Sequence, residues 1–153
     1  MAWRIVKRKY AKLAFNGEGA RRFGGRWNSP GVSMVYTAQS QSLAALEILV
    51  NAESSELLHH YVVMEVVIDP SLITRLDISE LPRNWRTDPP PRKLRTLGDL
   101  WIAQSSSAVM QVPSSVVPAE SNFLFNPRHL DFHKLRIGKT IAFRFDQRLS
   151  QQL

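Results

Sequence analysis

Short apolar runs, many of them rich in β-branched side chains, recur along this chain and predict strands. The run "HYVVMEVVID" is apolar at almost every position, which is typical of a central strand buried on both faces. The run "VSMVYTA", which predicts a strand ending near Tyr36, and the run "NFLFN" have the length of strands rather than of helices. We therefore predict strands at 2–8, 32–38, 60–69, 72–77, 108–114, 122–126 and 140–145.

Two segments have helical patterns. Ser40 is a good N-cap for the helix "QSLAALEILVN", which is apolar on almost all sides and is therefore expected to be largely buried. Thr96 and Asp99 are expected to cap a second helix, "LGDLWIAQS". The segment before it, "NWRTDPPPR", is rich in proline, which predicts a surface connection.

The order of these elements indicates the fold class. Strands and helices are mixed without a regular β–α–β alternation and without an internal repeat, so the α+β class fits the pattern. At 153 residues the chain is long enough to bury a core, and we expect a single domain over 1–153.

Composition and charge narrow the function. The chain has no cysteine, which excludes disulfides, thiol catalysis and cysteine-bound zinc. No apolar run approaches the roughly 18 residues of a membrane span and no signal peptide is recognised, so we expect a cytoplasmic protein outside the membrane. The net charge is +7, and residues 1–30 carry eight basic residues and one acidic residue. Such a surface attracts nucleic acid, nucleotide phosphates or an acidic protein.

The segment Ala11–Gly31 contains five glycines and no sustained period, which predicts a long loop. Long loops in compact domains are often functional. Gly24 and Gly25 allow close approach of the backbone to an anion, and Arg26 follows them with a bidentate fork for phosphate. The alternative is that the three arginines of this loop are solvated surface charges.

Glu47 is a lone carboxylate on the apolar helix, where it shares a face with Leu43 and Val50. A carboxylate in such surroundings is costly unless it is paired. Two interpretations are open. Glu47 is an edge residue that reaches solvent or pairs with a structural arginine, or it is a pocket carboxylate that stabilises positive charge or accepts a proton. Tyr36 likewise has two interpretations, a core tyrosine or an aromatic face on which a flat ring stacks.

Polar residues are interleaved with apolar ones in "VPSSVVPAESNFLFNPRHLDF". Because no G-x-S-x-G elbow is present, Ser114 or Ser115 is expected to bind a ligand rather than to attack one, unless both are turn residues. His129 and His133 have a spacing of four but no convincing third ligand, so no metal site is expected.

Taken together, four ordered motifs resemble one family. "GEGARRFGGRWNSPG", "VYTA", "SLAALEILV" and "VPSSVVPAESNFLFNPRHLDF" are similar to the corresponding blocks of RES-domain proteins, the toxins of bacterial toxin–antitoxin pairs. The resemblance covers nearly the whole chain. It implies a fold related to ADP-ribosyltransferases, with a mixed β-sheet core and flanking helices, and it implies NAD as the substrate, with no separate cofactor.

The family's named residues fall on particular positions of this chain. Its arginine corresponds to Arg26, its tyrosine to Tyr36, its glutamate to Glu47, and its serine to Ser114 or the adjacent Ser115. A further arginine that faces the pocket in the family corresponds to Arg4, in "WRIV".

The resemblance implies a role for each of these positions. Arg26, together with Arg4, is expected to hold the pyrophosphate, while Tyr36 stacks on the nicotinamide or its ribose. Glu47 is expected to stabilise the oxocarbenium-like state that forms when the nicotinamide–ribose bond breaks. The residues expected to orient a polar group of the substrate are Ser114 and Asn122.

Several alternatives stay open at the level of sequence. The ADP-ribose acceptor is water, phosphate or a protein side chain. The family context implies an Xre-like antitoxin that covers the pocket and makes any DNA contact. A different class, a basic nucleic-acid-binding module, is favoured by the pI of about 10.2 and by "RIVKRKYAK", although no helix-turn-helix, RNP-like strand or zinc finger is found.

Overall fold

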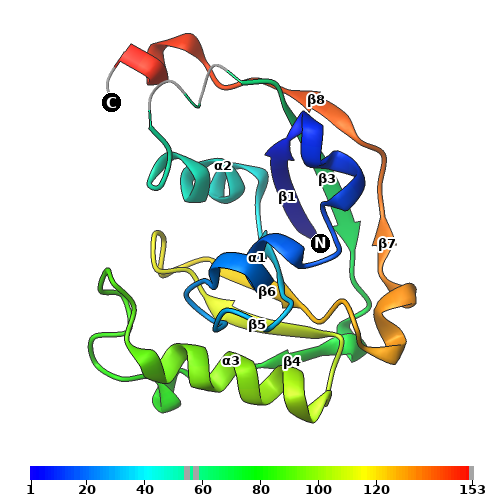
Figure 1. Cartoon of the computed structure of the whole chain (residues 1–153), viewed down its shortest axis with the longest axis vertical. Helices are drawn as coiled ribbons and strands as arrows, with labels where there is room; N and C mark the ends of the chain where they lie inside the picture. Colours follow the sequence, from blue (N-terminus) through cyan, green and yellow to red (C-terminus); the bar gives the residue numbers. More distant parts are fainter. Residues whose placement is uncertain (54–55, 57–58, 152–153) are drawn as a thin grey trace.

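The computed structural model describes residues 1–53, 56 and 59–151, and its centre is one curled, mixed β-sheet (Figure 1). Within the described residues the strand order is β4-β5-β6-β2-β1-β3-β7, and β8 also pairs with β3. All pairings are antiparallel except that of β4 with β5. The strands are β1 (Ala2–Lys7), β2 (Val35–Ala38), β3 (Tyr61–Val67), β4 (Ile73–Arg75), β5 (Val109–Pro113), β6 (Ser121–Phe125), β7 (Arg136–Ile137) and β8 (Ile141–Phe143).

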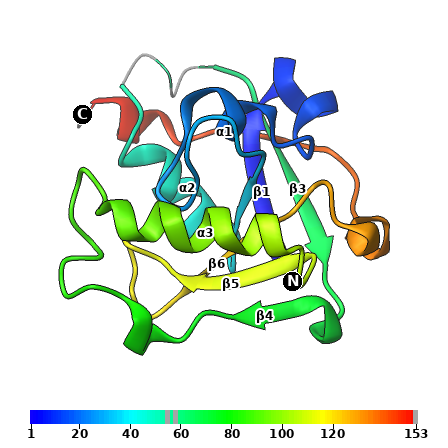
Figure 2. The same ribbon diagram turned by 60° about the horizontal axis from the view of Figure 1, so that its bottom comes forward.

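Two α-helices flank the sheet at different places. α2 packs on β1 and β2 through Leu43 and Ala44, whereas α3 runs along β5 and β6 (Figures 1 and 2). A third, shorter helix of 6 residues, α1, lies between them in Figure 1. The helices are α1 (Glu18–Phe23), α2 (Gln41–Leu49) and α3 (Arg92–Gln104), and the short 3₁₀ helices are η1 (Arg8–Leu13), η3 (Pro70–Leu72), η4 (Ile78–Glu80), η5 (Leu130–Lys134) and η6 (Gln147–Gln151).

The sheet buries side chains on both of its faces. In β6, Leu124 packs with Trp27 and Trp101 beneath α3, while its neighbours Phe123 and Phe125 point to the opposite core. Because both faces are covered, "NFLFN" shows no polar alternation. This mixed sheet with flanking helices confirms the expected α+β class, and every strand that we predicted is present.

The helix that carries Glu47 is less buried than predicted. Ser40 caps it as expected, since its hydroxyl accepts a hydrogen bond from the Leu43 N–H at 3.0 Å. However, Leu46 and Val50 are 40% and 58% exposed, so the prediction of a largely buried helix was wrong. Only one side of α2 lies on the sheet.

Two other predictions about elements were wrong. The segment expected to be a loop contains α1, which begins after Gly17 in a left-handed conformation with φ of 71°. The second helix begins at Arg92 rather than near Thr96, because Pro91 provides the extended residue that precedes it. Asp99 therefore lies inside the helix, where its carboxylate accepts a hydrogen bond from the Ser29 N–H at 2.9 Å instead of capping.

Candidate functional site

A cleft opens where β1 and β2 separate, since these strands pair only through Trp3 and Ala38. Three cavities of about 160, 440 and 720 Å³ surround this point, and Tyr36 lines all of them. Glu47 and Asn122 line both the smallest and the largest cavity. The three hollows therefore form adjoining parts of one site around the predicted residues.

Glu47 is held from two sides. The Ser114 hydroxyl and the Asn122 side-chain amide each donate a hydrogen bond of 2.8 Å to Oε1 of Glu47. None of the ion pairs within the described residues involves Glu47. The carboxylate is thus neither a solvated edge residue nor the partner of a structural arginine. It is a fixed acceptor in the wall of the cleft.

Ser114 and Ser115 have different surroundings. Ser114 is fully buried, and besides donating to Glu47 its hydroxyl accepts the N–H groups of Val116 and Val117, both at 3.1 Å. Ser115 lines the largest cavity, and its carbonyl accepts a hydrogen bond of 3.1 Å from Nε of Arg86. Ser114 is the serine that positions the carboxylate.

The Tyr36 hydroxyl is engaged in the fold. It donates to Oδ1 of the buried Asn28 at 2.7 Å and accepts from the Trp27 N–H at 3.0 Å. Burial raises the pKa of Tyr36 well above its ordinary value, so the phenol stays neutral. What Tyr36 offers the cleft is therefore its ring. Gly25 permits this arrangement, because a Cβ there would lie 2.6 Å from the Tyr36 hydroxyl oxygen.

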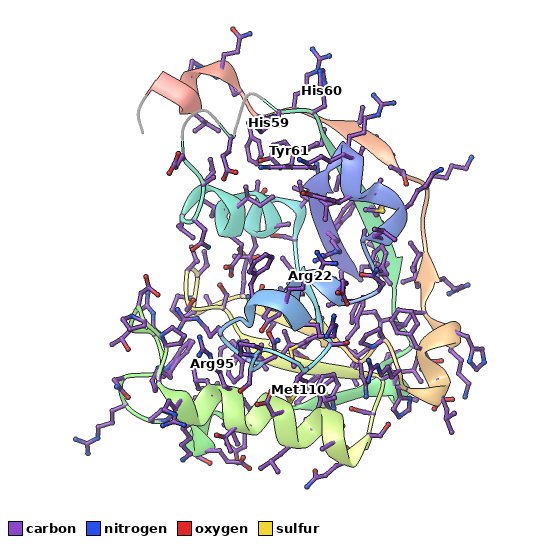
Figure 3. The ribbon with its side chains drawn as sticks, in the orientation of Figure 1. Arg22, His59, His60, Tyr61, Arg95 and Met110 are labelled. Carbon is purple, nitrogen blue, oxygen red and sulfur yellow. The ribbon has the colours of Figure 1, made fainter. Side chains whose placement is uncertain are left out.

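Three arginines line the largest cavity, and each is anchored by a backbone carbonyl. Arg26 donates to the carbonyls of Trp85 and Thr87 at 2.9 and 3.1 Å. Arg95, labelled in Figure 3, donates from Nε to the Gly25 carbonyl at 3.0 Å. No carboxylate neutralises them through an ion pair in the part of the chain that the structure describes. The arginines of this cavity are Arg26, Arg86 and Arg95.

Arg86 and Arg95 were not among the site residues predicted from the sequence. Arg86 lies in the proline-rich segment that was interpreted as a surface connection. Arg95 is a half-buried residue between Leu94 and Gly98, which face the core from α3. The available signal was a cation directly after Leu94, a core-facing helix residue. We placed the start of the helix after Arg95, so this signal was not recognised.

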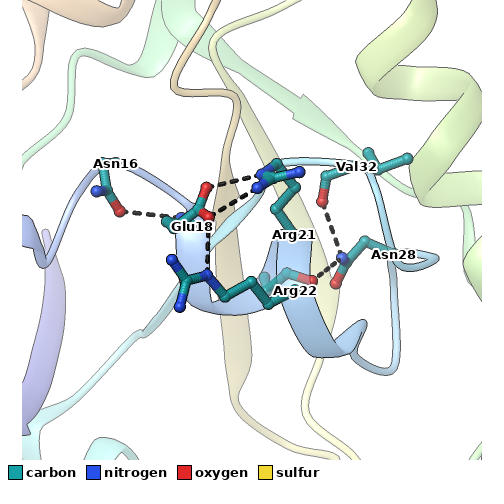
Figure 4. A network of polar contacts seen from close by, with 7 residues as sticks. Asn16, Glu18, Arg21, Arg22, Asn28 and Val32 are labelled. Carbon is teal, nitrogen blue, oxygen red and sulfur yellow. Dashed lines mark hydrogen bonds and ion pairs between the residues drawn. The ribbon is translucent and has the colours of Figure 1, made fainter.

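The other two arginines of the glycine-rich segment, Arg21 and Arg22, are not among the residues that line the large cavity. Arg21 and Arg22 form ion pairs with Glu18 at 2.7 and 2.9 Å, one helical turn apart (Figure 4). These hydrogen bonds hold the pKa of Glu18 at about 2. Asn28 ties the same segment together through the carbonyls of Ala20, Ser29 and Val32. Thus Arg26 alone of the three faces the large cavity.

Arg4 lies on the other side of Tyr36. Its Nη1 donates to the Tyr36 carbonyl, and it lines the two smaller cavities. Burial lowers the pKa of Arg4 to about 10, so the side chain remains a cation at neutral pH. Its Nε and Oδ1 of Asn122 are buried without hydrogen-bond partners in the part of the chain that the structure describes. Gly24, with φ of 70°, lines the medium and large cavities beside Gly25.

The N-terminal basic run is separate from this cleft. Lys7, Arg8 and Lys9 form a hollow of about 410 Å³ with His59 and His60. Figure 3 shows these two histidines far from Arg95, toward the opposite end of the molecule. The cleft and this basic surface are therefore independent features.

Neither a cluster of metal ligands nor a membrane-spanning helix is found among the described residues. They contain no group of three His, Asp or Glu side chains placed to hold a metal ion. His129 instead accepts the Asp131 N–H at 3.0 Å, and His133 contacts the Leu130 carbonyl at 2.7 Å. No helix within the described ranges has the length and apolarity needed to cross a bilayer.

Comparison with known proteins identifies the family. The family model described as "RES domain" matches residues 1–146 of the sequence. A protein named Toxin Res from Yersinia enterocolitica is 41% identical over 97% of this chain and 99% of its own length. Another Toxin Res, from Photorhabdus laumondii, is 38% identical over 96% and 95%. A Sphingobium protein named Prs ADP-ribosylating toxin is 33% identical over 96% and 94%.

A solved structure has the same fold. It is the MbcT–MbcA toxin–antitoxin complex of M. tuberculosis, one chain of which superposes with a TM-score of 0.77. The match covers 99% of this chain and 87% of that one, at 20% identity. At this identity the likeness concerns the fold.

Proposed function

Because this chain belongs to the RES domain family, we propose that it is the toxin of a toxin–antitoxin pair and that it binds NAD and breaks the nicotinamide–ribose bond. The observation that carries this proposal is the position of Glu47. Its carboxylate, fixed by Ser114 and Asn122, lies where a small cavity meets a large one. A dinucleotide that places its nicotinamide in the first and its phosphates in the second brings the scissile bond to this carboxylate.

The large cavity suits the diphosphate end of the substrate. Arg26, Arg86 and Arg95 each use part of the guanidinium on a backbone carbonyl, which fixes the group and leaves further N–H donors. Guanidinium groups that are held in place and form no ion pair among the described residues suit phosphate oxygens. Arg4 lines the other cavities, so its expected place beside Arg26 at the pyrophosphate has no support in this arrangement.

The chemistry follows from charge movement. When the nicotinamide–ribose bond breaks, its electron pair goes to the pyridinium nitrogen, and neutral nicotinamide leaves. The positive charge passes to the ribose as an oxocarbenium-like centre, which the Glu47 carboxylate stabilises. Because the leaving group needs no proton, no general acid is required. The ring of Tyr36, held by Asn28 and Trp27, forms the wall against which nicotinamide or ribose stacks.

The acceptor of the ADP-ribose defines the reaction. Water gives hydrolysis and phosphate gives phosphorolysis, both of which deplete NAD. Transfer to a protein side chain is the second candidate, favoured by the 33% identical relative named Prs ADP-ribosylating toxin. Mass spectrometry of products from purified protein and NAD, in buffer alone, with phosphate and with cell lysate, tests the proposal. Failure to release nicotinamide under all three conditions would refute it.

The antitoxin is proposed to act at the same cleft. One solved structure with this fold is a toxin–antitoxin complex. We expect a cognate Xre-family antitoxin to cover the site and to provide any contact with DNA. Co-purification with the neighbouring gene product should abolish NAD turnover, and a stable complex that still consumes NAD would contradict this arrangement.

A further inference from the structure

Among the described residues, two buried polar side-chain atoms have no hydrogen-bond partner, and both belong to residues that line the same small cavity. They are Nε of Arg4, a donor, and Oδ1 of Asn122, an acceptor. A buried polar group without a partner is costly, so such groups in native structures usually have a role. The rest of this 160 Å³ cavity is mostly apolar and aromatic, and its residues include Trp3, Ile5, Ala38, Ala44 and Ile48.

The orientation of the Asn122 amide is fixed by chemistry. Its Nδ2 donates to Oε1 of Glu47 at 2.8 Å. An ionised carboxylate only accepts hydrogen bonds, so turning the amide would place oxygen against oxygen. Asn122 therefore keeps its acceptor, Oδ1, on the side away from Glu47. Arg4 is fixed as well, because its Nη1 donates to the Tyr36 carbonyl.

We propose that this cavity is a carboxamide subsite, in which Nε of Arg4 donates to the amide oxygen of the substrate and Oδ1 of Asn122 accepts from the amide nitrogen. The proposal rests on the proposed function and specifies its substrate as the amide form of a pyridine dinucleotide. In this proposal Arg4 binds the nicotinamide end of the substrate instead of the pyrophosphate that was expected from the sequence. An aromatic amide has a flat apolar ring that suits the apolar lining of the cavity. Its amide group also provides an acceptor for Nε of Arg4 and a donor for Oδ1 of Asn122.

The same pair of atoms disfavours the acid form. Deamido-NAD carries a carboxylate in place of the carboxamide, and a carboxylate has no N–H for Oδ1 of Asn122. The second oxygen of the ligand carboxylate would face Oδ1 of Asn122. The Asn122 amide alone would then separate it from the Glu47 carboxylate. Arg4 would hold a carboxylate at least as strongly as a neutral amide, so selection against the acid form has to come from Asn122. Asn122 is thus the residue that distinguishes them.

The first test compares kcat/KM for NAD and deamido-NAD. Wild-type protein should prefer NAD by about 100-fold or more, because a buried acceptor is left unpaired by the acid form. Asn122→Ala should reduce this ratio to below about tenfold. Ser114→Ala is the matched control, since it removes the other hydrogen bond to Glu47 without touching the subsite, and its ratio should equal that of wild type. A wild-type ratio near one, or an unchanged ratio in Asn122→Ala, would overturn the proposal.

The second test needs no turnover and separates this proposal from the proposed function. Ligand-observed NMR of the wild-type protein should detect binding of free nicotinamide and about tenfold or weaker binding of nicotinic acid. Nicotinamide binding without NAD cleavage would retain the subsite and refute the reaction. NAD cleavage with equal binding of both compounds would retain the reaction and refute the subsite, leaving water as the partner of the two atoms.

Discussion

Ser114 and Glu47, 67 positions apart in the chain, are joined by a hydrogen bond of 2.8 Å from the serine hydroxyl to the carboxylate. The same hydroxyl accepts two backbone N–H groups of the turn that follows β5. One buried oxygen therefore connects the helix that carries the carboxylate to the strand that ends beneath it. The orientation of Glu47 depends on this connection and on Asn122.

Replacing Ser114 with alanine is expected to weaken both the fold and the reaction. The variant leaves two N–H groups and a carboxylate oxygen short of a partner, which should cost about 1–3 kcal/mol of unfolding free energy. Denaturant unfolding measures the stability, and NAD consumption by the purified variant should fall as well. Ser115→Ala is the control, because the hydrogen bonds that the Glu47 carboxylate accepts within the described residues come from Ser114 and Asn122. Equal losses in the two variants would contradict the distinction.

The phenol of Tyr36 is expected to matter for stability and its ring for turnover. Tyr36→Phe keeps the ring but leaves Oδ1 of Asn28 and the Trp27 N–H without the hydroxyl partner, which should lower the unfolding free energy by about 1–3 kcal/mol. Tyr36→Phe should retain most of the NAD turnover at a temperature where it is folded, whereas Tyr36→Ala should lose it. Complete inactivity of folded Tyr36→Phe would assign the hydroxyl a chemical role instead.

Arg95 is expected to act in substrate binding. Arg95→Ala removes a charged donor from the phosphate end, so KM for NAD should rise by about tenfold to 100-fold with a smaller change in kcat. Steady-state kinetics measures this split. Arg92→Ala, one turn earlier on the exposed side of α3, is the control and should leave both constants near wild type. An unchanged KM in Arg95→Ala would exclude Arg95 from the site.

The ion pairs of Glu18 predict an acid-dependent stability. The pKa of Glu18 lies at about 2 in the folded protein, against an ordinary value of 4.5, because Arg21 and Arg22 donate to the carboxylate. Its stabilising effect is therefore complete above pH 4.5 and is lost as the pH falls toward 2. Melting temperatures at pH 5 and pH 3 should differ more for wild type than for Glu18→Gln. Equal differences would show that these exposed pairs contribute nothing.

The sequence predicted much of this architecture because strands and caps depend on local pattern. The β-branched run that forms β3 and the Ser40 cap of α2 needed no tertiary information. Predicting the burial of α2, in contrast, needs tertiary information. Val50 lines the large cavity instead of the core, and an apolar residue in a cleft wall has the same local pattern as one in a core.

The predicted site residues were recognised singly, and the structure brings them together. Glu47, Ser114 and Asn122 come from α2, the end of β5 and β6, and only the pairing of β2 with β6 and of β5 with β6 places them side by side. Arg86 had no local feature that distinguishes it from a solvated arginine, since its place in the cleft depends on how the proline-rich segment folds back. Long-range contacts are what the sequence pattern leaves undetermined.

The most direct test of the central claim measures NAD loss and nicotinamide release by purified wild-type protein and Glu47→Gln, with Glu80→Gln as an exposed control. Glutamine keeps the oxygen that accepts from Ser114 and Asn122, so the variant should unfold at a temperature close to that of wild type. Loss of the negative charge should lower turnover by about 100-fold or more, because the oxocarbenium-like centre loses its stabilising partner. Folded Glu47→Gln that consumes NAD at the wild-type rate would contradict the account.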